Sequence, residues 1–143
     1  MTSLETLNNL VKVGLLKIDP PDQAEFNGLL KLAQARLKDA HNEAISEESR
    51  FDLAYNAVHS LALAALRWHG YRPARQRFVV FQALQHTLGL PPEQWRVVDS
   101  AHTIRNQAEY EGYLEIDELL IAAILQIADT LSSKVAALAS IDP

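Results

Sequence analysis

The stretch SEESRFDLAYNAVHSLALAALRWHG, residues 46–70, decides the fold class of this chain. Its apolar residues recur at steps of three and four, which is the spacing of one face of a helix. Ser46 is a good N-cap, and the pattern ends at Gly70, a common residue after a helix. The apolar stripe consists of Phe51, Ala54, Val58, Leu61 and Ala65. The small residues of the same stretch predict close packing on more than one side: Ala54, Ala57, Ala62, Ala64 and Ala65.

The flanking segments carry the same helical period. A short helix is expected from Thr2 to Gly14, a shorter one from Phe78 to Gly89, and long ones after Pro91-Pro92 and after the cap Asp117. A further long helix is expected after Asp19-Pro20-Pro21-Asp22, with a cap and first-turn prolines. No alternating run bounded by tight-turn residues indicates a strand. The chain is therefore predicted to be all-α, an up-and-down bundle of four to five antiparallel helices plus a short N-terminal helix.

Length and composition limit the class of protein. A chain of 143 residues fits one domain, here a helical bundle over residues 19–143 preceded by a helical arm over residues 1–18. The absence of cysteine excludes disulfides, thiolate zinc sites and a cysteine nucleophile. No signal peptide or membrane span is evident, so a soluble, cytoplasmic protein without a membrane partner is expected.

The charge distribution is acidic overall, with a net charge of −5, which disfavours a protein that coats nucleic acid. Two basic groups stand against this trend and are interpreted as ordinary solvated charges. One lies near the amino end, at Lys12 and Lys17. The other surrounds the loop after Gly70, at Arg67, Arg72, Arg75 and Arg77.

Arg105 occupies an unusual place on the helix predicted over residues 92–110. A helical wheel puts it inside the apolar arc of about 120° that this helix presents. That arc contains Val97, Val98, Ala101, Ile104 and Ala108. A guanidinium stays charged and is costly to bury, so it must be paired within the protein or held ready for an anion.

Polar residues accompany Arg105 at helical spacing. His102 and Glu109 lie one turn before and after it, and Asn106 follows it directly. These residues either form a structural network or line a cleft that takes a phosphate or base. Asp99 and His102 alone do not make a metal site, and the sequence contains neither a glycine-rich phosphate loop nor a nucleophile elbow. No metal and no cofactor is therefore expected.

The run RNQAEY, residues 105–110, resembles the signature of the HEPN superfamily, which is Arg, a polar residue, three variable residues and His. The resemblance extends over roughly residues 22–139 and includes the last two long helices. It implies a homodimeric bundle in which two signatures meet across a cleft, often as a metal-independent ribonuclease. It also implies a toxin–antitoxin or defence context, with RNA and a nucleotidyltransferase antitoxin as partners.

Carried over by position, Arg105 would hold the scissile phosphate, Asn106 would orient the signature, and Tyr110 takes the place of the histidine. An unperturbed tyrosine, with a pKa of about 10, keeps its proton at neutral pH, so binding is favoured over cleavage. His102 is the alternative proton carrier. Binding roles are expected for His102, Glu109 and Tyr113, and nucleotidylation for Tyr110 or Tyr113. An active ribonuclease and a pure interaction module remain the alternatives.

Overall fold

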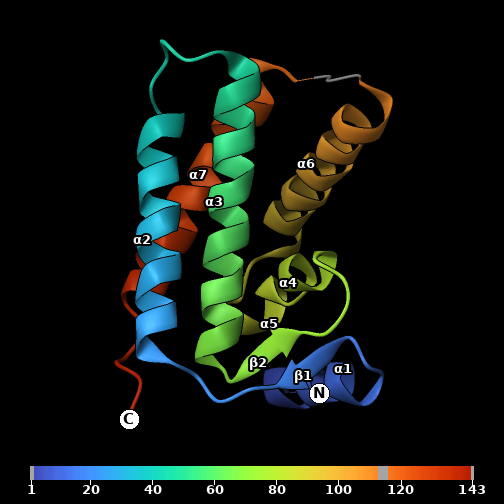
Figure 1. Cartoon of the computed structure of the whole chain (residues 1–143). Helices are drawn as coiled ribbons and strands as arrows, with labels where there is room; N and C mark the ends of the chain where they lie inside the picture. The colour runs from blue at the N-terminus through green and yellow to red at the C-terminus, as the bar shows by residue number, and fades with distance from the viewer. Residues whose placement is uncertain (1, 113–115, 143) are drawn as a thin grey trace.

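The computed structural model describes residues 2–112 and 116–142. Long helices that alternate in direction confirm the predicted all-α, up-and-down bundle (Figure 1). In chain order the elements are α1 (Ser3–Lys12), β1 (Leu16–Ile18), α2 (Gln23–Ala40), α3 (Glu47–Trp68), β2 (Tyr71–Pro73), α4 (Phe78–Gln82), α5 (Leu84–Thr87), α6 (Pro92–Glu111) and α7 (Glu118–Ala136).

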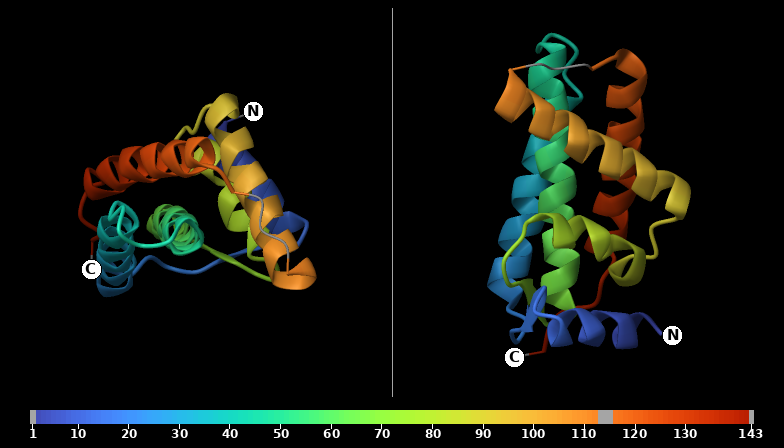
Figure 2. Two further views of the ribbon diagram at one scale, coloured as in Figure 1. Left: turned by 90° about the horizontal axis from the view of Figure 1, so that it is seen from above. Right: turned by 90° about the vertical axis from the view of Figure 1, so that its right-hand side faces the viewer.

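Helix α3 is the centre of the bundle. It contacts α2, α7, α4, α5 and α6, and α6 runs obliquely across one side of α3 and α7 (Figure 2). The predicted small residues explain this position, because Ala54, Ala57, Ala64 and Ala65 are all completely buried. Short side chains let several helices approach one helix closely, so the alanines of α3 fix the spacing of the whole bundle.

Capping residues set the helix boundaries, largely as the sequence predicts. The side chains of Thr2, Ser46 and Asp117 each accept a hydrogen bond from a first-turn backbone N–H. The predicted first-turn prolines of α2 are wrong. Asp22 is the cap, with its carboxylate 2.8 Å from the Glu25 N–H, so Pro20 and Pro21 both precede the helix.

A small sheet contradicts the expectation of no strands. β1 and β2 pair antiparallel, with Lys17 opposite Arg72. Each strand has only three residues, too few to reveal an alternating pattern in the sequence. The pairing attaches the amino-terminal residues to the bundle, as do the buried Leu7 and the 2.6 Å hydrogen bond from the Tyr71 hydroxyl to Asn8. The helix predicted over residues 78–89 is also divided, because α4 ends at Gln82 and α5 begins at Leu84, with Ala83 between them.

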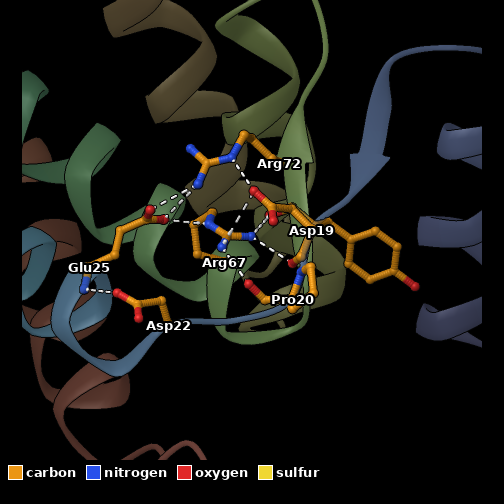
Figure 3. A network of polar contacts seen from close by, with 7 residues as sticks. Asp19, Pro20, Asp22, Glu25, Arg67 and Arg72 are labelled. Atoms are coloured by element: carbon orange, nitrogen blue, oxygen red, sulfur yellow. Dashed lines mark hydrogen bonds and ion pairs between the residues drawn. The ribbon is translucent and has the colours of Figure 1, made fainter. Parts of the chain in front are cut away.

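Arg67 lies at the junction between this sheet and the bundle, and it corrects the interpretation of the basic group as solvated charge. Its side chain is 2% exposed, and every guanidinium nitrogen has a partner (Figure 3). Nε donates to the Glu25 carboxylate, Nη1 donates to the Asp19 carbonyl at 2.9 Å, and Nη2 donates to the Pro20 carbonyl at 2.8 Å. The guanidinium therefore holds the chain between β1 and α2 against the end of α3.

Arg72 completes the network from β2. Its Nε donates to Asp19 at 2.8 Å and its Nη2 donates to Glu25 at 2.8 Å (Figure 3). The hydrogen bond from Arg72 lowers the pKa of Asp19. Burial alone would raise the pKa of Glu25, but the hydrogen bonds and charges of Arg67 and Arg72 outweigh it and lower that pKa. The network thus stabilises the fold at neutral pH and loses this effect as pH falls below about 4.

Within the described residues, α7 is the one helix that is long and apolar enough to cross a membrane by length and composition. Its apolar residues Ile121, Ile124 and Leu131 are completely buried in this structure, and the helix packs against α3 and α2. A core helix of a soluble protein has the same composition, so the structure is compatible with a soluble protein.

Replacing Arg67 by methionine tests the role of this junction. Arg67→Met is expected to lower the free energy of unfolding by roughly 3–5 kcal/mol, because Glu25 and the carbonyls of Asp19 and Pro20 lose a buried charged donor. Urea unfolding followed by circular dichroism measures the effect. Arg75→Met, an exposed change in the loop after β2, is the control and should stay within about 0.5 kcal/mol of the unmodified protein. Equal urea midpoints for Arg67→Met and Arg75→Met would contradict the structural role of Arg67.

Candidate functional site

Helix α6 carries the predicted site residues and packs on the bundle through a narrow face. It begins at Pro92, as the sequence predicts, and ends at Glu111; the next residue, Gly112, has a φ of 66°, a left-handed conformation that suits glycine. Only Val98 and Ala101 of α6 are buried. Arg105 lies on the same face one turn later, where α6 faces the first half of α3.

The Arg105 guanidinium is held on three sides. Nη1 donates to the Glu109 carboxylate at 2.9 Å, and Cζ lies 5.1 Å from the centroid of the Tyr55 ring. Nε is 3.7 Å from the Asp52 carboxylate, yet it is buried and makes no hydrogen bond within the described residues. The side chain is 26% exposed. Arg105 is thus neither a free surface charge nor a fully satisfied one.

His102 and Asn106 form a second polar contact on this face. Asn106 Nδ2 lies 3.2 Å from His102 Nε2, and the Tyr55 hydroxyl lies 2.9 Å from His102 Nδ1. An amide nitrogen can only donate, so His102 Nε2 must accept and the proton must reside on Nδ1. His102 is therefore a neutral imidazole that positions Asn106 and donates to Tyr55.

Aromatic rings surround this histidine. The His102 ring stacks on Phe78 with 4.5 Å between centroids, and Phe81 lies 5.8 Å away. Burial lowers the pKa of His102 below its ordinary value; the charges of Arg105 and Arg77 add to this, while Asp99 opposes it. The lowered pKa agrees with the neutral form that the hydrogen bonds require.

The structure brings together some of the predicted residues and separates others. His102, Arg105, Asn106 and Glu109 share one face of α6 with residues of α3. Tyr110 is 82% exposed and projects into solvent, so it does not join this face within one chain. Tyr113 lies outside the described residues. We use the name Arg105 face for the site formed by Asp52, Tyr55, His102, Arg105, Asn106 and Glu109.

Two residues of this face come from α3 and were missed by sequence reasoning. Asp52 and Tyr55 are one turn apart, so they present a carboxylate and an aromatic ring to the same helix. Tyr55 is 2% exposed, and burial raises the pKa of its hydroxyl. The sequence feature that could have identified Tyr55 is its position among alanines in a central helix. A tyrosine there is buried, and its hydroxyl needs a hydrogen-bond partner from another helix.

The chemistry available here is anion recognition. An anionic group from another molecule can reach the exposed edge of the Arg105 guanidinium if it displaces Glu109. His102 engages both ring nitrogens in contacts to Tyr55 and Asn106, so it is not placed as a general base. Within the described residues, no group of three or more His, Asp or Glu side chains is placed to hold a metal ion.

The chain matches no model of a known protein family, and a search of curated proteins found no matching relative.

His59, one turn after Tyr55 on α3, gives a pH-dependent test of the aromatic cluster. Its ring lies 5.4 Å from Phe81 and its Nε2 is buried without a hydrogen bond in the described residues. Burial, reinforced by the charges of Arg77, Arg36 and Arg105, lowers its pKa to about 4. The unfolded chain takes up this proton first, so the free energy of unfolding should fall between about pH 6.5 and 4, by roughly 3 kcal/mol.

We compare the unmodified protein with His59→Leu by urea unfolding across this pH range. The free energy of unfolding of His59→Leu should fall much less as the pH is lowered. His86→Gln is the control, at a half-buried histidine of α5, and its free energy of unfolding should fall as in the unmodified protein. Parallel curves for the unmodified protein and His59→Leu would show that His59 is not buried in its neutral form.

Arg105→Met distinguishes a binding residue from a structural one. The variant loses two ion pairs with exposed carboxylates and one cation–π contact, and it also removes a buried nitrogen without a hydrogen bond. We therefore expect a loss of at most about 1.5 kcal/mol in the free energy of unfolding. Urea unfolding beside Arg67→Met measures the difference between the two arginines. A loss as large as that of Arg67→Met would identify Arg105 as an interhelical strut.

Proposed function

We propose that this chain is a HEPN-like, dimeric helical protein that acts in the cytoplasm by binding a partner through the Arg105 face. The partner is RNA or a nucleotidyltransferase-type protein, in a toxin–antitoxin or defence context, and RNA cleavage is weak or absent. The proposal joins the resemblance of residues 105–110 to the HEPN signature with the physical state of Arg105.

The observation that carries the proposal is the incomplete satisfaction of Arg105. Its buried Nε makes no hydrogen bond in the described residues, while a quarter of the side chain (26%) remains exposed. Leaving a guanidinium in this state costs free energy, because a buried donor loses its hydration. The exposed part of the same guanidinium is open to an external anion.

The charges around Arg105 favour a protein partner over RNA. Asp52 and Glu109 lie against the guanidinium, and the whole chain carries a net charge of −5. RNA binding depends on several cations that neutralise phosphates together, and although the charge of Arg77 also acts on Tyr55 and His102, the carboxylates of Asp52 and Glu109 offset the positive charge at Arg105. A protein partner can offer one carboxylate or phosphate with favourable charges around it.

The positions of the titratable groups support weak or absent cleavage. A ribonuclease of this kind needs a proton carrier next to the phosphate that Arg105 holds. Tyr110 projects into solvent, and His102 is occupied by Tyr55 and Asn106. The exposure of Tyr110 suits another role that the family resemblance implies, which is to accept a nucleotidyl group from a nucleotidyltransferase-type partner.

A homodimer is consistent with the small contribution of α6 to the core. Only Val98 and Ala101 of this helix are buried within one chain. The remaining surface of α6 is open to a second copy, which would bring a second Arg105 face close to the first.

Arg105→Ala tests the proposal, with Arg96→Ala as the matched control on an exposed position of the same helix. The measurements are analytical ultracentrifugation, affinity for total RNA, and affinity for the product of the neighbouring gene. We expect a dimer whose affinity for its partner falls at least about tenfold in Arg105→Ala, as for the loss of one charged contact, and is unchanged in Arg96→Ala.

Two outcomes would contradict the proposal. Unchanged affinity of Arg105→Ala for RNA and for the partner would show that the site is structural. Growth arrest on expression of the chain alone, relieved by Arg105→Ala, would instead identify an active ribonuclease.

A further inference from the structure

A pocket lies on the other side of α3 from the Arg105 face. It is an open depression lined by the end of α2, the connection from α2 to α3, and the outer face of α7, and it has a volume of about 370 Å³. Volumes of this size accommodate small molecules. We call it the α7 pocket; Arg50, Glu43, Glu118, Ala122, Leu125 and Gln126 are the lining residues on which its chemistry depends.

Arg50 supplies a fixed positive charge to the α7 pocket. The residue is 7% exposed, and its Nε donates to the Ala40 carbonyl at 2.9 Å, which fixes the guanidinium plane. Its Nη1 lies 3.8 Å from the Glu118 carboxylate, beyond hydrogen-bonding distance. Within the described residues, the terminal nitrogens of Arg50 have no hydrogen-bond acceptor. They can bind an anionic group that enters the pocket, beside the 3.8 Å ion pair with Glu118.

Carboxylates stand opposite this guanidinium. Glu118 and Glu43 line the α7 pocket, and Glu47 interacts with Glu118. The contact with Glu118 raises the pKa of Glu47; burial and Asp117 act in the same direction and Arg50 opposes them. Like-charged groups this close are stabilised by a cation placed between or beside them. The pocket therefore offers a site for negative charge and a site for positive charge next to each other.

The rest of the pocket is suited to a short organic group. Leu125, which is 6% exposed, forms an apolar floor, and Ala122 adds a small side chain that leaves space above it. Gln126 contributes an amide. His41 and Asp129 also line the pocket, and His41 Nε2 lies 3.1 Å from the Asp129 carboxylate.

We propose that the α7 pocket binds a free α-amino acid, with its carboxylate on Arg50 and its ammonium group on Glu118. The two charges of an α-amino acid are attached to one carbon, so from the open side of the pocket they can bridge a guanidinium and a carboxylate that lie 3.8 Å apart without a hydrogen bond. The ligand carboxylate accepts from the terminal nitrogens of Arg50, and the ammonium donates to Glu118. The side chain lies over Leu125 and Ala122.

Other ligand classes fit the same residues less well. A phosphate or dicarboxylate would be repelled by Glu43, Glu118 and Asp129. A metal ion would be repelled by Arg50, and the described residues contain no cluster placed to hold one. A purely apolar molecule would leave the buried guanidinium without an acceptor. An amino acid has a carboxylate for Arg50, an ammonium group for Glu118 and a side chain for the apolar floor.

The α7 pocket is independent of the proposed function. Arg50 and Asp52 are two residues apart on α3, which separates their directions by about 200°. Arg105→Ala should therefore leave amino-acid binding unchanged, and failure of one proposal does not decide the other.

Isothermal titration calorimetry and ¹H–¹⁵N NMR test the proposal on the full chain. The probes are leucine, glutamine and glycine, with 4-methylpentanoate and 3-methylbutylamine as analogues of leucine that lack the ammonium or the carboxylate. We expect leucine or glutamine to bind with a Kd of about 1 mM or tighter, and both analogues to bind at least about tenfold more weakly. The side-chain amide of Gln126 and the Nε–H of Arg50 should shift on binding.

Two variants test whether the amino acid binds in the α7 pocket. Ala122→Met fills the space above the floor and should weaken binding at least about tenfold, whereas Ala35→Met, at an exposed position of α2, should not. Glu118→Gln removes the ammonium contact, so leucine should bind no better than 4-methylpentanoate. Both positions on α7 are exposed, so each variant should fold.

Three results would overturn the proposal. The first is no binding of any amino acid up to about 10 mM, which is weaker than a specific pocket of this kind should show. The second is equal affinity for leucine and 4-methylpentanoate, which would indicate a simple anion site. The third is undiminished binding to Ala122→Met, which would place the ligand elsewhere on the protein.

Discussion

The buried guanidinium of Arg67 is the interaction on which the arrangement of this molecule depends. It joins the last turn of α3 to Glu25 on α2 and to the carbonyls of Asp19 and Pro20, which lead into that helix. Backbone carbonyls in an irregular segment have no helical partner of their own, so a single planar donor that satisfies several of them orders the whole turn. The same guanidinium donates to the Tyr71 carbonyl of β2, so the junction also contacts the small sheet.

Three arginines in this chain differ in how many of their guanidinium nitrogens form hydrogen bonds within the protein. Arg67 has a partner at every nitrogen and serves the fold. Arg50 uses only Nε in a hydrogen bond, and Arg105 uses only Nη1, within the described residues. All three are costly to place among apolar neighbours, so a fully bonded guanidinium indicates a structural role and a partly bonded one indicates a place for another molecule.

Helix periodicity and capping allowed much of the fold to be predicted, because α3, α6 and α7 have clear stripes and identifiable first residues. The short strands could not be predicted, since pairing over three residues depends on Arg67 and Tyr71, which come together only in the folded chain. For the Arg105 face, the sequence identified the helix and its polar residues. It could not identify the contribution of α3, because the spacing within one helix contains no information about which side chains of another helix face it.

Helix α6 adds only Val98 and Ala101 to the interior, whereas α3 is enclosed by neighbours along most of its length. The two helices therefore differ in their freedom to change during evolution. Enlarging an alanine of α3 would push several helices apart at once. Surface residues of α6 can be exchanged with little effect on folding, so a lineage that keeps this core can acquire new recognition specificities by altering a single helix.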